Sequence, residues 1–194
     1  MRKLVLAMMT SLDGRLDKLE EWLAAPSDEI DTEFERIYET FDTVLIGHTA
    51  YHEMAPYWPK AETDPNMSDA NKRLARKLNT YKKYVFSRKD DKTPLTWNNC
   101  ELVTTPTDQD LFKFVNNLKA QQGKDIHVVG GAHFAQSLSG LGLVDEYQLY
   151  VFPVVSKGVT WFEKIEAKND LIFLKAVPFQ NGAICLHYTS KFTT

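Results

Sequence analysis

The segment Asp125-Ile126-His127-Val128-Val129-Gly130-Gly131-Ala132-His133-Phe134 decides how the rest of the chain is interpreted. A short apolar run that ends in two glycines and continues into a helical pattern indicates a buried strand, a tight exit and the first turn of a helix. Glycines let a ligand approach the backbone, and the N–H groups of a first helical turn are donors for a phosphate. Strand-Gly-Gly is also typical of an ordinary tight turn, so the phosphate interpretation needs support from other segments.

The composition is that of an ordinary globular protein. The 194 residues are 43% hydrophobic and 25% charged, which predicts one domain over residues 1–194. A formal net charge of −3 and dispersed lysines argue against nucleic-acid binding. The apolar run at residues 4–9 is too short for a membrane span or the core of a signal peptide. Cys100 and Cys185 fit a reducing compartment, with one bridge between them left open, and we expect a cytoplasmic protein.

Strand patterns alternate with helical patterns along most of the chain. We expect strands at residues 4–9, 43–46, 83–86, 101–104, 125–129 and 146–155, and helices at residues 50–54 and 132–139 and from about residues 28, 68 and 108. A long irregular connection is expected at residues 55–68, and Pro153 indicates a strand that reaches an edge or a bulge. Residues 171–177 and 183–188 flank Gln180-Asn181-Gly182, a strong hairpin signal. The pattern predicts a three-layer α/β fold with a mainly parallel central sheet and an antiparallel C-terminal hairpin.

Three strand ends carry residues suited to a bound nucleotide. Gly47 follows the second strand, Ser87 and Arg88 follow the third, and Gly130 follows the fifth. Ligands of such sheets lie at the carboxyl ends of the strands. We therefore expect these junctions to meet along one rim of the sheet.

These motifs, in their order, resemble the dihydrofolate reductase-like superfamily. In particular, the chain is similar to bacterial proteins related to the C-terminal reductase domain of the bifunctional riboflavin-biosynthesis deaminase/reductase. The resemblance covers nearly the whole chain and rests on Ser11-Leu12-Asp13-Gly14, Val44-Leu45-Ile46-Gly47-His48-Thr49, Val85-Phe86-Ser87-Arg88, Val128-Val129-Gly130-Gly131, and Leu143-Val144-Asp145-Glu146 with Pro153 and Gly158. It implies a dihydrofolate reductase-like fold, use of NADPH and assembly as a homodimer.

The resemblance also implies which residues contact the cofactor and the substrate. The expected cofactor-binding residues are Asp13, Gly14, Gly47, His48, Thr49, Ser87, Arg88, Gly130, Gly131, Ala132, His133 and Phe134. Within this set the glycine pair would contact the diphosphate. Ser87 and Arg88 would bind the adenosine 2′-phosphate, and Asp13-Gly14 would lie against the nicotinamide. The expected substrate contacts are Trp22, Asp31, Phe34, Tyr51 and Trp58. Each motif has an ordinary alternative: a solvated strand-end cation for Arg88, a turn for Asp13-Gly14 and a helix N-cap for Thr49.

Two departures from the family pattern narrow the function. His48 stands where the family usually has Arg, so the 2′-phosphate depends more on Arg88, and the preference for NADPH over NADH stays open. Residues 51–59 replace the paired-Asp, Pro and downstream Arg segment that the riboflavin reductases use on their substrate. We therefore expect a flat or apolar heterocycle in place of the riboflavin precursor.

No catalytic acid is assigned from the sequence. Dihydrofolate reductase relies on a buried carboxylate on the helix after the first loop, and the carboxylates here are Asp28, Asp31 and Glu35. Asp31 borders the apolar face of that helix, but a solvated helix charge is the commoner role. His48 and His52 are four residues apart without a third ligand, and no metal site is expected.

Two functions follow from the sequence. The first is an NADPH-dependent reductase that transfers a hydride to a small heterocyclic substrate. The second is a non-catalytic nucleotide-binding or regulatory protein that keeps the fold. Neither requires a membrane or a nucleic acid as a partner.

Overall fold

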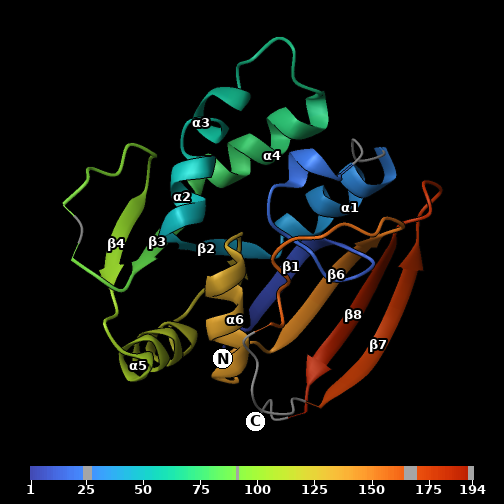
Figure 1. The fold of residues 1–194 in the computed structure, drawn as a ribbon. Coiled ribbons are helices and arrows are strands. Elements are labelled where there is room, and N and C mark those ends of the chain that lie inside the picture. Colours follow the sequence, from blue (N-terminus) through green and yellow to red (C-terminus); the bar gives the residue numbers. More distant parts are fainter. Residues whose placement is uncertain (24–27, 91, 164–169, 192–194) are drawn as a thin grey trace.

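The computed structural model describes residues 1–23, 28–90, 92–163 and 170–191. Within these ranges eight strands form one sheet in the order β4-β3-β2-β5-β1-β6-β8-β7 (Figure 1). The strands are β1 (Leu4–Ser11), β2 (Phe41–Gly47), β3 (Lys82–Ser87), β4 (Cys100–Thr104), β5 (Asp125–Val128), β6 (Glu146–Phe152), β7 (Leu171–Pro178) and β8 (Ile184–Ser190). Neighbours from β4 to β6 are parallel, and β8 is antiparallel to both β6 and β7. The predicted mainly parallel sheet with an antiparallel C-terminal hairpin is confirmed.

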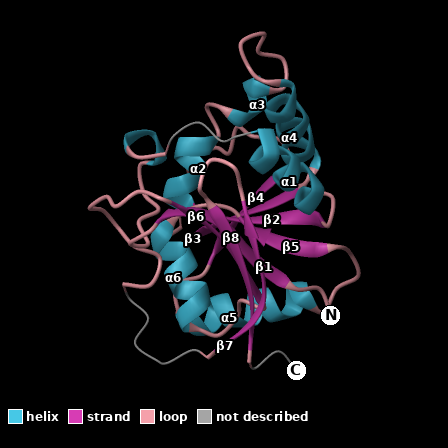
Figure 2. Cartoon of the chain, turned by 90° about the vertical axis from the view of Figure 1, so that its right-hand side faces the viewer, coloured by secondary structure: helices cyan, strands magenta, loops and turns pink. Residues whose placement is uncertain are grey.

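Helices cover both faces of the sheet, as predicted (Figure 2). On one face lie α1 (Asp28–Tyr38), α2 (His48–Met54) and α4 (Asp69–Thr80), with the short helix α3 (Trp58–Ala61) packed against α4. On the other face lie α5 (Asp108–Lys119) and α6 (Ala132–Gly140). A 3-10 turn spans Leu19–Glu21. No helix in the described ranges is long and apolar enough to cross a membrane.

The central strand β1 supplies side chains to both layers of the core. Val5 and Ala7 belong to the apolar cluster that includes residues of α1 and α2, whereas Leu4 and Leu6 belong to the cluster that includes residues of α5 and α6. Because neighbouring side chains of a strand point to opposite faces, a strand covered on both sides must be apolar at every position. This explains the continuous apolar run that begins the chain.

Two local predictions are wrong. The connection at residues 55–68 contains helix α3, whose first turn includes Pro59 and whose Ala61 is buried, so it is not irregular throughout. Strand β6 ends at Phe152, short of residue 155, and it lies between β1 and β8 in the interior of the sheet. Pro153 therefore marks the point where β6 stops, because a proline has no N–H for the ladder.

Candidate functional site

The three predicted junctions meet along one rim of the sheet. Strand β2 lies between β3 and β5, with Gly47 opposite Phe86 and Leu45 opposite Val128. All three strands are parallel, so their carboxyl ends lie side by side, and α2 and α6 leave from this rim (Figure 1). The expected convergence of Gly47, Ser87 and Gly130 is confirmed as geometry.

The glycines allow helices α2 and α6 to begin very close to one another. A Cβ atom on Gly47 would lie 2.8 Å from the Cβ of Phe134, and a Cβ on Gly131 would lie 3.5 Å from that of Ala50. Gly130 and Gly131 have φ angles of 67° and 89°, which side chains rarely adopt. Gly130 is exposed at the rim. The glycine pair therefore packs the two helix starts together and also presents bare backbone at the surface.

Helix α6 starts at this junction with the three residues predicted beside the diphosphate. Ala132 is half-buried and His133 is exposed, with its Nδ1 3.3 Å from Oε1 of Gln136. The ring of Phe134 stacks on Phe86, with centroids 4.9 Å apart. An α-helix leaves its first-turn N–H groups without intrahelical acceptors, so this turn has donors for an anion.

At the end of β3, Arg88 is held by main-chain and carboxylate acceptors. Its Nη1 donates to the carbonyl of Thr105 at 3.2 Å, and its Nη2 pairs with Asp108, the first residue of α5. Both side chains of this ion pair are substantially exposed, at 43% and 65%. The adjacent Ser87 hydroxyl accepts from the amide of Lys89 at 3.2 Å. Arg88 is at the predicted place, and Asp108 is a competitor there for any anion.

His48 and His52 form an exposed pair at the start of α2. Their Nε2 atoms are 3.2 Å apart, so one ring nitrogen donates and the other accepts. Thr49 is exposed on the same helix. No cluster of three or more metal-binding side chains occurs among the described residues.

The loop after β1 carries Asp13 and Gly14 and is docked onto the segment after β6. The Oδ1 of Asp13 accepts from the Ser11 hydroxyl at 2.5 Å and from the amide of Ser156 at 3.2 Å. These two hydrogen bonds lower the pKa of Asp13. Gly14 lies against the ring of Phe162, where a side chain would collide. Asp13 and Gly14 therefore hold the loop against the segment after β6.

Arg15 organises the same loop, and it is not among the residues predicted from the sequence. Its side chain is almost completely buried and bonds to Asp17 at 2.9 Å, to Glu21 at 2.6 Å and to the Ser156 hydroxyl at 2.6 Å. The hydrogen bond from Arg15 lowers the pKa of Glu21. The carboxylates two and six residues after Arg15 were a signal in the sequence for its ion pairs. The hydrogen bond to Ser156, 141 residues away, left no signal in the sequence.

Two of the five predicted substrate contacts are packed deep in the core. Tyr51 is 1% exposed, and its hydroxyl accepts from the amides of Thr96 and Trp97, so it is a packing residue and we withdraw it as a substrate contact. Phe34 is buried, with its ring 4.6 Å from that of Tyr150.

The other predicted substrate contacts are Trp22, Asp31 and Trp58. Trp22 is 9% exposed, and its indole N–H donates to the carbonyl of Asp17. Asp31 on α1 and Trp58 on α3 are half-buried. Trp58 packs against the core cluster beneath α1 and α2. Asp28 begins α1, but its side chain lies outside the described part of the chain.

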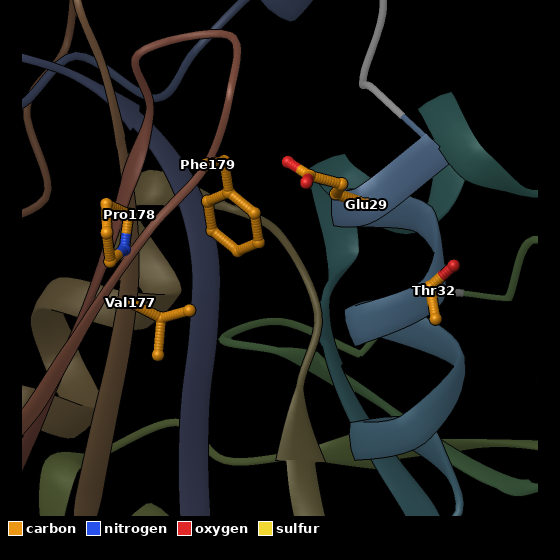
Figure 3. Close-up of a pocket in the computed structure, with 5 residues that line it drawn as sticks. All are labelled: Glu29, Thr32, Val177, Pro178 and Phe179. Atoms are coloured by element: carbon orange, nitrogen blue, oxygen red, sulfur yellow. The ribbon is translucent and has the colours of Figure 1, made fainter.

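A hollow of about 440 Å³, open to solvent, lies between α1 and the β7–β8 hairpin (Figure 3). Its lining residues are Glu29, Thr32, Val177, Pro178 and Phe179, and none of them was predicted. The Glu29 carboxylate accepts from the amide of Gln180 at 2.9 Å and so ties the hairpin to the start of α1. This hollow shares no lining residue with the glycine rim.

Comparison with known proteins identifies the family. Residues 2–185 match the model of the RibD C-terminal domain. The chain belongs to this family. It is 30% identical over 191 residues to the uncharacterized protein YyaP of Bacillus subtilis (strain 168), an alignment that covers 96% of this chain and 94% of that one.

Solved structures show the same fold at low sequence identity. A putative riboflavin biosynthesis protein from Shewanella sp. PV-4 superposes with a TM-score of 0.70 at 20% identity, over 98% of this chain and 99% of that one. Dihydrofolate reductase from Enterococcus faecalis, complexed with NADP(H), superposes with a TM-score of 0.62 at 12% identity, over 97% and 96% of the two chains. The dihydrofolate reductase-like fold and the family resemblance inferred from the motifs are both confirmed.

Proposed function

We propose that the protein is an NADPH-dependent reductase that transfers a hydride to a small, flat heterocyclic substrate. The observation that carries the proposal is the meeting of Gly47, Gly130-Gly131 and Arg88 along one rim of a sheet whose family and fold neighbours include reductases. Bound NADPH would supply the hydride, and the chain would supply binding and orientation.

The residues at the rim fit a dinucleotide phosphate. Gly130 is exposed and has a positive φ angle, so bare backbone stands at the point where α6 begins. The first-turn amides of α6 would hold the diphosphate, and the guanidinium of Arg88 would hold the 2′-phosphate. Thr49 and His48 would contact the phosphates from the start of α2.

The loop that Arg15 fastens would cover the reacting end of the site. Its carboxylates are poor proton donors, because hydrogen bonds lower the pKa values of Asp13 and Glu21 and keep both ionised at neutral pH. The pKa of Asp17 is also lowered. Burial raises this pKa, but hydrogen bonds from Arg15 and from the amide of Val159 outweigh the effect of burial. The loop therefore positions the ligand and excludes water, and we assign it no proton transfer.

Equilibrium titration with NADPH and NADH tests the cofactor assignment. A charge-assisted contact between Arg88 and a phosphate is worth about 1.5–3 kcal/mol, so Arg88→Ala should raise the Kd of NADPH roughly tenfold or more. The Kd of NADH should change little. Arg73→Ala is the matched control, because Arg73 is an exposed arginine of α4 paired with Glu35. Failure of the unaltered protein to bind either nucleotide below millimolar concentration would refute the proposal.

A non-catalytic nucleotide-binding protein is the second candidate, favoured by the ionised state of the loop carboxylates. Loss of nicotinamide absorbance on mixing with NADPH and a panel of dihydrofolate, pterins and flavins separates the two. Turnover of any member establishes the reductase. Tight nucleotide binding without turnover across the panel favours the regulatory protein.

A further inference from the structure

The two histidines of α2 have the spacing of ligands to one metal ion. The Nε2 atoms of His48 and His52 are 3.2 Å apart, and the centroids of the two rings are 4.5 Å apart. Zinc binds an imidazole nitrogen at about 2.0–2.1 Å. Two such bonds to nitrogens 3.2 Å apart enclose an angle of roughly 100–106° at the metal, close to the tetrahedral angle of about 109°. The nitrogens therefore lie at the separation that a single Zn²⁺ requires.

Both side chains are held on a rigid part of the fold. His48 is the first residue of α2, directly after β2, and His52 follows four residues later, so the two side chains lie on one face of the helix. The His52 ring also lies edge-on to the buried ring of Tyr51, with centroids 5.4 Å apart. The Tyr51 hydroxyl accepts two main-chain hydrogen bonds from residues 96–97. Little conformational freedom is left to lose on binding an ion, which favours affinity.

We propose that His48 and His52 bind a divalent transition-metal ion, with Zn²⁺ as the ion that matches their spacing. Imidazole is a ligand for Zn²⁺, Cu²⁺ and Ni²⁺, whereas Mg²⁺ and Ca²⁺ select oxygen atoms. No group of three or more possible ligands occurs in the described part of the chain, so water would fill the other positions around the metal. The ion would take the place of the proton that the two rings share.

The histidine pair lies at the rim where the nucleotide is proposed to bind, because α2 and α6 begin there (Figure 1). A metal ion would supply positive charge at the point where this chain has His48 in place of the arginine usual in the family. The positive end of a helix opposes a nearby cation, but by no more than about fivefold in affinity. The metal site needs no bound nucleotide, so its test is independent of the reductase proposal.

Calorimetric titration of the full chain with Zn²⁺ alone, after removal of any affinity tag, tests the site. We expect one ion per chain with a micromolar Kd, and no binding of Mg²⁺ under the same conditions. His48→Gln and His52→Gln should each raise the Kd of Zn²⁺ at least tenfold, because one imidazole cannot form a chelate. His133→Gln is the matched control, since His133 is exposed on α6 and its loss should leave the Kd unchanged.

A spacing control and a site-specific signal complete the test. The double variant His52→Gln/Glu53→His keeps the number of histidines but moves the second ring by about 100° around the helix, so it should bind as weakly as His52→Gln. In nuclear magnetic resonance spectra, Zn²⁺ should shift the ring signals of His48 and His52 and not those of the buried His127 and His187.

Thermal unfolding separates loss of the site from loss of the fold. Without metal, the histidine variants should unfold at the temperature of the unaltered chain, whereas Zn²⁺ should raise this temperature only in chains that keep both His48 and His52. Absence of Zn²⁺ binding below millimolar concentration overturns the proposal. So does a Kd that is unchanged in His48→Gln, or one that the spacing variant restores, because neither agrees with a two-histidine chelate.

Discussion

Replacement of Gly47 by alanine tests whether the close approach of β2 and α6 is a structural requirement of the rim. Gly47 has φ −68° and ψ 144°, a conformation open to any residue, so the backbone is not strained by the change. The new Cβ would lie 2.8 Å from the Cβ of Phe134, whereas ordinary contact begins at 3.4 Å, so α6 must move by at least 3.4 − 2.8 = 0.6 Å. Overpacking of this kind costs about 1–3 kcal/mol.

Gly140→Ala is the control for this substitution. It makes the same chemical change at the other end of α6, where a Cβ meets nothing within 4 Å. Both variants restrict the unfolded chain in the same way, which stabilises each by about 0.4–1 kcal/mol. The difference between them therefore isolates the collision with Phe134. We expect Gly47→Ala to unfold at a lower urea concentration than Gly140→Ala, and its free energy of unfolding to be lower by about 1–3 kcal/mol.

A second substitution locates the collision at a single atom. Phe134→Ala keeps the Cβ that the new methyl group meets, so it should not rescue Gly47→Ala, whereas Phe134→Gly should recover part of the loss. Nucleotide titration then connects stability with binding: a displaced α6 should raise the Kd of NADPH in Gly47→Ala and leave it unchanged in Gly140→Ala. Equal stability of the two glycine variants would refute the steric argument.

Three further predictions concern individual side chains. Asp108→Asn removes the carboxylate that competes for Arg88, so the Kd of NADPH should fall a few-fold while that of NADH changes less; equal effects on both nucleotides would contradict this role. His127 is fully buried, and burial lowers its pKa to about 4, so only the unfolded chain gains a proton below pH 6.5. The free energy of unfolding should therefore decrease by up to about 3 kcal/mol as the pH falls from 6.5 to 4. In His127→Phe, the free energy of unfolding measured by chemical denaturation should depend less on pH over this range. Tyr51→Phe leaves the buried N–H of Trp97 and the part-buried N–H of Thr96 without their acceptor and should cost about 1–3 kcal/mol in thermal or urea unfolding, with the Kd of NADPH unchanged.

The order of the fold was predictable because its signals are local. The run at residues 4–9 is apolar at every position, as a strand covered on both faces must be, and Gln180-Asn181-Gly182 turns β7 back into β8. Helix α3 was not predictable, because a single turn has no helical periodicity to detect. Its existence depends on packing against α4, where Ala61 is buried.

The candidate site was predictable only in part, because some of its features follow from local signals and others depend on tertiary packing. Parallel strands bring their carboxyl ends to one rim, so motifs at three strand ends had to converge. The contacts of individual side chains were not accessible from the sequence. The bond from Arg15 to Ser156 and the acceptor role of the Tyr51 hydroxyl join segments that are far apart in the chain. Their identity depends on tertiary packing, which no local pattern encodes.

The ion pair between Arg88 and Asp108 bears directly on the choice of cofactor. An exposed pair of this kind is worth at most about 1 kcal/mol, because water screens both charges. A bidentate contact with a phosphate is worth more, about 1.5–3 kcal/mol. Exchange of the Asp108 carboxylate for a 2′-phosphate is therefore favourable, and the pair is compatible with NADPH. With NADH no phosphate arrives to displace Asp108, so the same pair should persist, and the selectivity between the two nucleotides should depend on residue 108 as well as on Arg88, but to a smaller extent.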